Sequence, residues 1–310
     1  PGRTLDRIVY GRARDSLVFN YHPSVIADLA ASGFKVIGTG NNHAADRGPL
    51  GMDRTIEEIR RHGIAHTGTR LRADEAKPWS TIVGARGMSV AWLACTYSTN
   101  GMPDPHRQVL NCYADKSLIL DEVRALAGND AVDAVIVSPH WGHEDSHHPL
   151  ASDRRWAREI IEAGADAVVG AHPHVLQPWE RIATPEGREG LVIYSLGNFI
   201  SNQRTLAQRT GLIALIELAR GERKARVSAA GFIPTWVDVW RGHVVSELTA
   251  GPEGRGAALA AALSILPAGN RVDAGSFRSL PRACAGTPAA AAIADAPPVA
   301  VAPPDPPDAS

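Results

Sequence analysis

The sequence predicts a mixed α/β fold whose strands are mainly parallel. Between about residues 17 and 200, short apolar runs alternate with helix-like segments, which is typical of βαβ units. Between about residues 211 and 248 the helix-like segments disappear and strand-like runs follow one another, which indicates an antiparallel meander. The chain has 310 residues and is therefore long enough to bury a large core.

Each element is predicted from its local pattern. The helix at 22–33 has Pro23 near its start and Gly33 after its end, and Gly63 ends an amphipathic helix at 49–63. Further elements of the alternating region are strands at 16–20, 34–40, 132–138, 165–170 and 191–195, two strands within 80–95, and helices at 115–128 and 150–164. The later region contains strands at 211–219, 225–240 and 243–250, and a helix at 251–266.

These elements predict one main domain over residues 1–250. A C-terminal helix and extension follow at 251–284. Residues 285–310 consist mostly of alanine and proline and contain no aromatic residue. Such a segment cannot bury enough apolar surface to fold alone, so we expect a disordered tail.

The composition excludes several classes of protein. The net charge is −1 and the pI is about 7.0, which gives no sign of the basic face that a nucleic-acid-binding protein needs. No apolar run approaches the ~18–20 residues of a membrane helix. Cys95, Cys112 and Cys284 are odd in number and widely spaced, so they predict neither a disulfide framework nor a zinc ribbon. Cys95 ends an apolar strand pattern and is interpreted as a core residue.

Polar residues follow the predicted strands at the points where these end. The clusters lie at 41–48, 139–148 and 171–174, and a fourth segment, "LGNFIS", follows the strand at 191–195. In open α/β sheets, ligands bind outside the carboxyl ends of the strands, so these clusters could share one crevice. The histidines of these loops are His43, His140, His143, His147, His148, His172 and His174.

The segment "AHPH" illustrates the expected geometry. Pro173 disfavours helix and favours an extended residue before it, so His172 and His174 are predicted to be extended. Alternate residues of an extended chain point to one side, roughly 6.5–7 Å apart. The two imidazoles would then face one point, as in a metal or phosphate site. They could equally be structural histidines beside a proline turn.

The donor types favour particular metals. Imidazoles and an asparagine oxygen suit zinc, iron or manganese better than calcium or magnesium. A catalytic pair of metals usually also needs bridging carboxylates, for which the candidates are Asp46, Glu144, Asp145 and Asp166. Ordinary structural interpretations remain open: "NNH" could form a turn, and His143 with Glu144 could form a surface pair.

Four motifs together resemble a known family. In order, they are "FNYHPSVIADLAASGFKVIGTGNNHAADRG", "HWGHE", "GADAVVGAHPHVLQPWE" and "IYSLGNFIS". They resemble the CapA-type poly-γ-glutamate (capsule) synthesis proteins of bacteria, over about residues 15–240. The resemblance implies a calcineurin-like metallophosphoesterase fold, a four-layer αββα sandwich.

The resemblance also implies roles for single residues. Asn42, His140, His172 and His174 match metal ligands. His43 matches the residue that protonates or steadies the leaving group, and Asp46 would orient its imidazole. Glu144 and Asn198 are expected to contact the substrate or to support the metal ligands from outside. The implied cofactor is a divalent metal (Mn, Zn or Fe), with one or two ions.

The sequence departs from the family pattern at its beginning. The family opens with a strand that ends in a "GD" aspartate, followed by an "NLE" element, and both supply carboxylate ligands. Neither element is found here. The resemblance therefore implies a sandwich that lacks its first strand, a fragment or a diverged copy, with a site reduced to imidazoles and an asparagine.

Two functions from different classes remain. The first is a metal-dependent hydrolase of the phosphoesterase type, with His43 as general acid. The alternative is a non-catalytic cell-envelope protein that binds or helps export an anionic polymer such as poly-γ-glutamate. The expected location is the cell envelope, periplasmic or extracellular, with any membrane association through a segment that precedes this sequence.

Overall fold

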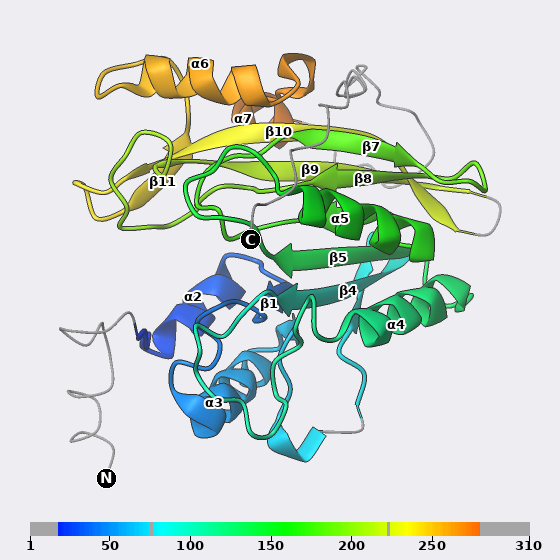
Figure 1. The fold of residues 1–310 in the computed structure, drawn as a ribbon. Coiled ribbons are helices and arrows are strands. Elements are labelled where there is room, and N and C mark those ends of the chain that lie inside the picture. Colours follow the sequence, from blue (N-terminus) through cyan, green and yellow to red (C-terminus); the bar gives the residue numbers. More distant parts are fainter. Residues whose placement is uncertain (1–17, 75–76, 222–223, 280–310) are drawn as a thin grey trace, which may run out of the picture. The chain divides into compact units, whose positions relative to one another are not determined.

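The computed structural model describes residues 18–74, 77–221 and 224–279 (Figure 1). The chain forms two compact units, Pro1–His140 and Trp141–Ser310. Each unit combines strands with helices, so the predicted mixed α/β class is confirmed. Within the described residues, no helix is both long and apolar enough to cross a membrane.

The N-terminal unit is built on two small sheets. One pairs β1 (Val36–Gly38) with β2 (Ala65–Thr67) in parallel. In the other, β4 (Met88–Thr96) lies between β3 (Thr81–Ala85) and β5 (Ala134–His140), antiparallel to the first and parallel to the second. The remaining elements are α2 (Ser24–Ala31), α3 (Gly48–Arg61), α4 (Lys116–Gly128) and a 3₁₀ turn at Arg72–Asp74.

Helix α3 shows why this unit folds as its sequence pattern predicts. Met52, Ile56 and Ile59 recur at helical spacing and are all buried, whereas Arg54 and Glu57 between them are exposed. Pro49 stands in the first turn, where its missing N–H leaves no helical hydrogen bond unmade. Gly63 has a φ of +69° and follows the helix end, a position that favours glycine.

The C-terminal unit contains two sheets. In the first, β8 (Glu189–Ile193) pairs with β6 (Ala167–Val169) in parallel and with β7 (Trp179–Ala183) in antiparallel fashion. In the second, β10 (Ala225–Asp238) lies between β9 (Thr210–Arg220) and β11 (Val244–Glu247), and both pairings are antiparallel. The helices are α5 (Ala151–Ala163), α6 (Arg255–Ile265) and α7 (Ala274–Ser279), with a 3₁₀ turn at Ala268–Asn270.

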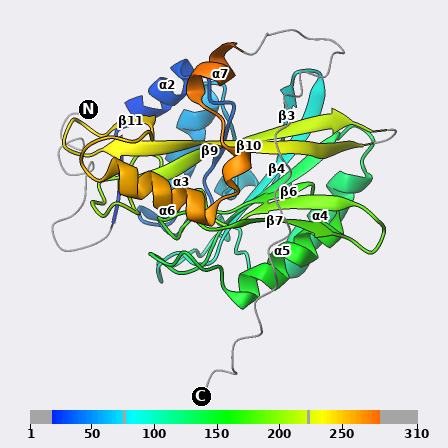
Figure 2. The ribbon, with the colours of Figure 1, turned by 90° about the horizontal axis from the view of Figure 1, so that it is seen from above.

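These elements form four layers within the C-terminal unit. The two sheets meet where the ring of Trp179 on β7 lies edge-on to Phe232 on β10, with ring centroids 5.6 Å apart. Helix α6 covers the outer face of the meander through a cluster of Trp236, Leu248 and Ala258, and Figure 2 shows the helix alongside this sheet. Helix α5 covers β8, where Ile161 leaves no room for a side chain at Gly190. The predicted αββα order is therefore present in this unit.

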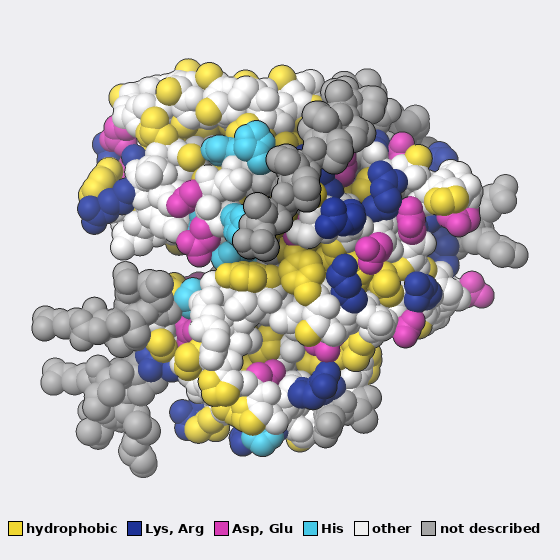
Figure 3. Space-filling model, in the orientation of Figure 1, with side chains coloured by type: hydrophobic (Ala, Val, Ile, Leu, Met, Phe, Trp, Pro, Cys, Tyr) yellow, Lys and Arg dark blue, Asp and Glu magenta, His cyan; other side chains and the backbone are white. Residues whose placement is uncertain are grey.

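The side chains that α6 presents outward are small. On the face drawn in Figure 3, small hydrophobic side chains and backbone dominate the region over α6. This agrees with the sequence of the helix, "RGAALAAALSI", in which Ala258 and Ala262 are the buried positions. Alanine lets the helix approach the bulky Trp236 closely.

The predicted elements are largely confirmed, with shifted ends. The strand predicted at 16–20 is wrong in its described part, because residues 18–20 form no strand. The sequence patterns did not reveal β2 and β7, which have only three and five residues. The tail predicted at 285–310 lies outside the described residues, and the single domain predicted for 1–250 stays a prediction.

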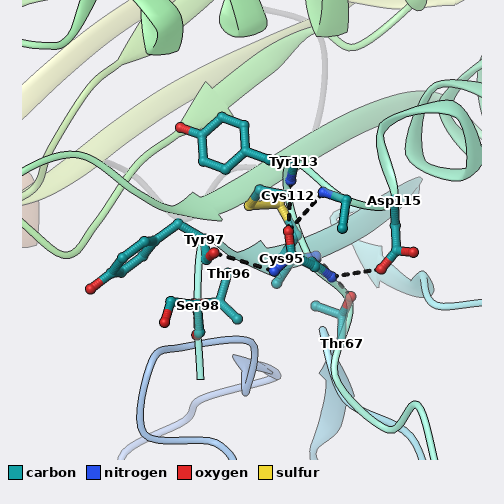
Figure 4. The surroundings of a disulfide bond; sticks show 11 residues. Thr67, Cys95, Thr96, Tyr97, Ser98, Cys112, Tyr113 and Asp115 are labelled. Atoms are coloured by element: carbon teal, nitrogen blue, oxygen red, sulfur yellow. Dashed lines mark hydrogen bonds between the residues drawn. A yellow bond between two sulfur atoms is a disulfide. The ribbon is translucent and has the colours of Figure 1, made fainter. Parts of the chain in front are cut away.

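One disulfide corrects the interpretation of the cysteines. Cys95, at the end of β4, is bonded to Cys112, and both residues are fully buried (Figure 4). The chain between them returns to β4, where the Thr96 N–H donates to Leu110 O and the Cys112 N–H donates to Thr96 O. Cys95 is thus a core residue, as predicted, but it is also cross-linked. Cys284 lies outside the described residues.

Candidate metal centre

In the N-terminal unit, two predicted ligands lie side by side. Asn42 follows β1 and is 6% exposed, and His140 is the last residue of β5. The Oδ1 atom of Asn42 lies 3.0 Å from the Nε2 atom of His140. The loop reaches this point because Gly40 packs directly on the backbone of Cys95, where a Cβ would stand 3.2 Å from the Cys95 Cα.

This spacing fits a shared metal ion. Two ligand atoms about 2.1 Å from one ion and at right angles to each other lie about 3.0 Å apart. Without an ion, the same spacing makes a hydrogen bond from the imidazole N–H to the amide oxygen. An imidazole nitrogen and an amide oxygen are also the donor types that zinc, iron and manganese accept. The pair therefore fits the ion that the sequence predicts.

His43 and Asp46 form a second pair in the same unit. The Nδ1 atom of His43 lies 2.9 Å from Oδ2 of Asp46, a side chain that is only 4% exposed. The same oxygen accepts a hydrogen bond of 2.7 Å from the Phe19 N–H, and the ring of Phe19 meets the imidazole edge-on, with centroids 4.5 Å apart. The imidazole is thus held from two sides, and the orienting role of Asp46 stays a prediction.

In the C-terminal unit, three predicted site residues lie together. Ligand atoms of Glu144, His172 and His174 all lie within 4.8 Å of one another, and Glu144 Oε1 is 3.8 Å from His174 Nε2. His172 is buried and His174 half-buried, whereas Glu144 is exposed. Two ligands on opposite sides of one ion lie about 4.2 Å apart, so a small side-chain adjustment would let all three bind it.

The prediction that His172 and His174 are extended is wrong. Their φ values are +104° and +62°, in the left-handed region that residues with a Cβ rarely adopt. The rings nevertheless converge, with centroids 6.0 Å apart. Hydrogen bonds from the Trp141 N–H to Ala171 O and from the Asp145 N–H to Pro173 O fasten this segment to the preceding loop. Strained residues of this kind persist where surrounding structure holds them, often at functional sites.

Asn198 supports His174 from outside. Its Nδ2 group donates to Gln203 Oε1 at 2.7 Å and to Gln208 O at 2.9 Å, so its Oδ1 atom faces Nδ1 of His174 at 2.9 Å. An amide oxygen only accepts, so Nδ1 of His174 must carry the proton. Nε2 of His174, the atom that faces Glu144, is then the nitrogen that could accept a metal ion.

Other acidic and histidine candidates have different partners. The Asp166 carboxylate lies 3.7 Å from the Arg188 guanidinium, and Asp145 accepts a hydrogen bond from Gln208. His147 Nδ1 lies 2.7 Å from Leu176 O, in hydrogen-bond contact with the backbone. These contacts connect separate segments of the unit through the side chains of Asp145, His147 and Asp166.

The sequence did not indicate Asn100. Its Oδ1 atom accepts a hydrogen bond of 3.2 Å from Nδ2 of Asn42. Asn100 lies in a turn after β4, in a segment without a recognisable motif. The structure therefore groups the site residues as Asn42, His43, Asp46, Asn100 and His140 in one unit, and as Glu144, His172, His174 and Asn198 in the other.

Comparison with known proteins gives a family match. The profile of the bacterial capsule synthesis protein family PGA_cap matches residues 9–203. The PGA biosynthesis protein CapA of Bacillus subtilis is 31% identical over 196 residues, which is 63% of this chain and 50% of that protein. The capsule biosynthesis protein CapA of Bacillus anthracis is 26% identical over 208 residues, 64% of this chain and 47% of that protein. The chain thus spans about half the length of these curated relatives.

The solved structures that match this chain share less sequence identity with it than the capsule proteins do. The calcineurin-like phosphoesterase YfkN from Bacillus subtilis shares 12% sequence identity, with a TM-score of 0.42. The match covers 79% of this chain and 74% of that one.

Proposed function

The chain belongs to the bacterial capsule synthesis protein family, and on this premise we propose that it is a metal-dependent hydrolase of the phosphoesterase type. The observation that carries the proposal is the convergence of Glu144, His172 and His174, whose ligand atoms lie within 4.8 Å of one another. Two of these residues hold left-handed backbone angles, which a simple connecting loop does not require.

The proposed ligands follow from the donor atoms. Asn42 and His140 would hold an ion in the N-terminal unit through Oδ1 and Nε2, and His172, His174 and Glu144 would do so in the C-terminal unit. Zn²⁺, Mn²⁺ or Fe²⁺ suits this donor set. When bound, such an ion supplies Lewis-acid chemistry, which polarises a phosphoryl oxygen and stabilises the charge that develops on it.

His43 is proposed as the general acid. Its Nδ1 atom is engaged by the Asp46 carboxylate at 2.9 Å, which leaves Nε2 to deliver a proton to a leaving-group oxygen. Asp46 accepts this hydrogen bond and so fixes the tautomer and the ring orientation. Because its carboxylate is buried and also receives the Phe19 N–H, it holds the imidazole in one orientation.

Metal content and turnover test the proposal directly. The wild-type chain should bind Mn²⁺ or Zn²⁺ in equilibrium dialysis and hydrolyse bis(p-nitrophenyl) phosphate. His172→Ala should lose the ion of the C-terminal unit together with activity, whereas His43→Gln should keep the metal and lose about 10²–10⁴-fold in kcat. His148→Ala changes an exposed histidine outside the donor sets and serves as the control. If the wild-type chain binds neither Mn²⁺ nor Zn²⁺, the proposal is wrong.

The alternative function, binding of an anionic polymer without turnover, is favoured by a different observation. The guanidinium of exposed Arg204 lies 4.9 Å from the ring centroid of Trp240, which is 63% exposed. Among the described residues Arg204 makes no ion pair, so its N–H groups can bind a carboxylate. If Arg204→Ala lowers the affinity for the polymer and His172→Ala does not change it, the result favours polymer binding over hydrolysis.

The substrate class and the location are proposed from the family and the disulfide. The relatives named above act in capsule or PGA biosynthesis, which makes poly-γ-glutamate the first polymer to test. The buried Cys95–Cys112 disulfide supports folding in an oxidising compartment, as in the cell envelope. Alkylation of free thiols before and after reduction, on protein from its native host, tests this directly.

A further inference from the structure

We propose that Asn100 is a positioning residue that turns the amide of Asn42 so that its oxygen faces the metal. The proposal rests on the metal site of the proposed function, and it concerns only residues of the N-terminal unit. Asn100 contacts no predicted ligand except Asn42 in the contacts described, so it would act through that residue.

The need for such a residue follows from the chemistry of an amide. The two ends of an Asn side chain are alike in shape, but only the oxygen can bind a cation, because the NH₂ group has no available lone pair. Asn42 is buried, so hydrogen bonds to bulk water do not determine the orientation of its amide. The hydrogen bond of 3.2 Å from Nδ2 to Asn100 Oδ1 fixes the NH₂ end, and Oδ1 is thereby directed to His140.

Asn100 is itself held by its turn. Its backbone N–H donates to Ser98 Oγ at 2.8 Å, and the Met102 N–H donates to Thr99 O at 3.0 Å. Its φ of +54° is left-handed, a conformation that Asn tolerates better than most residues. The turn lies in the segment between Cys95 and Cys112, whose two ends are joined by the disulfide drawn in Figure 4.

A purely conformational role for Asn100 makes a different prediction. Asn and Gly both tolerate a positive φ, so Asn100→Gly preserves the turn while it removes the side-chain acceptor. Asn100→Asp keeps an acceptor oxygen and a residue type that tolerates this backbone. A positioning role therefore predicts that the two variants differ, whereas a conformational role predicts that both bind metal like the wild type.

The experiment measures Mn²⁺ affinity by isothermal titration calorimetry, without reference to activity. Asn100→Gly should bind Mn²⁺ about tenfold more weakly than the wild type. Loss of a residue that supports a metal ligand typically weakens metal binding about 10–100-fold, and we expect the lower end of this range because Asn100 is exposed. Asn100→Asp should restore affinity to within about threefold of the wild type. His140→Ala, which removes a ligand, should weaken binding more than either. Circular dichroism of the metal-free proteins establishes that each variant is folded.

The outcomes separate this inference from the proposed function. If His140→Ala loses affinity and Asn100→Gly does not, the positioning role is wrong and the metal site remains. If Asn100→Asp binds as weakly as Asn100→Gly, the acceptor oxygen is not what matters, and the inference is equally overturned. If the wild-type chain binds no Mn²⁺ or Zn²⁺, the metal site fails and the inference fails with it.

Discussion

Single side chains in both units are oriented by one neighbouring polar group each. Asp46 engages Nδ1 of His43, Asn198 engages Nδ1 of His174, and Asn100 engages Nδ2 of Asn42. In every case the neighbour engages one end of the side chain and leaves the other end for the role proposed above. Residues that hydrogen-bond to metal ligands determine the tautomer and the ring orientation of those ligands. Their substitution therefore tests a metal site without removing a ligand.

Removal of the outer partner of His174 should weaken metal binding without removing a ligand. Asn198→Ala removes the oxygen that accepts the Nδ1–H of His174. The imidazole then loses part of its preference for the tautomer in which Nε2 carries no proton. We expect a loss of about 10–100-fold in Mn²⁺ or Zn²⁺ affinity in competition with a chelating dye. His147→Ala, which removes a histidine bonded to a backbone carbonyl, should leave the affinity within about twofold. An equal loss in both variants would contradict the assignment.

The sequence predicted that His172 and His174 converge, but it did not predict the backbone that carries them. His172 and His174 were placed on one side by assuming an extended chain, but their φ values are positive and the rings converge for another reason. The hydrogen bonds that fasten this segment come from Trp141 and Asp145, about 30 residues earlier in the chain, and local patterns do not contain such contacts. Asn100 was missed for the same reason, since only the folded loop brings it to Asn42.

At the scale of elements, the disulfide should account for a measurable part of the stability of the N-terminal unit. Cys95 and Cys112 are 17 residues apart, and closing a loop of this length stabilises a fold by about 3 kcal/mol. Reduction should therefore lower the midpoint of thermal unfolding by about 6–12 °C. The double variant Cys95→Ala/Cys112→Ala should unfold near the lower temperature and show no response to the reductant. A wild-type midpoint that ignores the reductant, despite complete reduction of the thiols, would refute this.

An ion-pair cluster that links α3 to the 3₁₀ turn after β2 should make stability depend on pH. Hydrogen bonds from Lys77 and Arg60 to the buried Asp74 hold the pKa of this carboxyl below its ordinary value of 3.8. A lowered pKa stabilises the fold above the unfolded-state value, and this stabilisation is lost as the pH falls through the folded-state value. The contribution is on the order of 1 kcal/mol, because Lys77 and Arg60 are themselves exposed.

Urea unfolding of wild type and Asp74→Asn between pH 6 and pH 2 measures this contribution. The difference in the free energy of unfolding should be constant near neutral pH and should shrink below about pH 4. Asp121→Asn is the matched control, since Asp121 pairs with Arg124 on an exposed surface and its side chain is 75% exposed. A difference for Asp74→Asn that does not change with pH would rule out the proposed cause.

The elements that the sequence predicted are those with a long, regular pattern. Helix α3 shows the helical repeat of Met52, Ile56 and Ile59, and β10 extends over fourteen residues. The three residues of β2 have no periodicity to detect, and this strand exists because β1 lies beside it. The Cys95–Cys112 bond depends in the same way on a loop that returns to β4, so the spacing of the cysteines did not reveal it.

At the scale of the whole chain, each of the two units carries its own group of proposed metal ligands. The N-terminal unit contributes an amide and an imidazole that fit one ion, and the C-terminal unit contributes two imidazoles and a carboxylate. The order of these segments along the chain matches the bacterial capsule synthesis family, whose profile covers both sets at residues 9–203. A measurement of metal binding can therefore test each group by itself.

Substitutions in each unit, alone and combined, provide that measurement. His140→Ala in the N-terminal unit and His174→Ala in the C-terminal unit should each weaken the binding of Mn²⁺, because each variant removes one proposed ligand. The gain in thermal stability with added Mn²⁺ is about 2.7 kcal/mol at a concentration a hundred times the Kd, and it should be smaller in both single variants and smallest in the double variant. An unchanged gain in either single variant would reject the substituted histidine as a ligand, because a ligand that binds only the folded chain stabilises it by an amount that rises with its affinity.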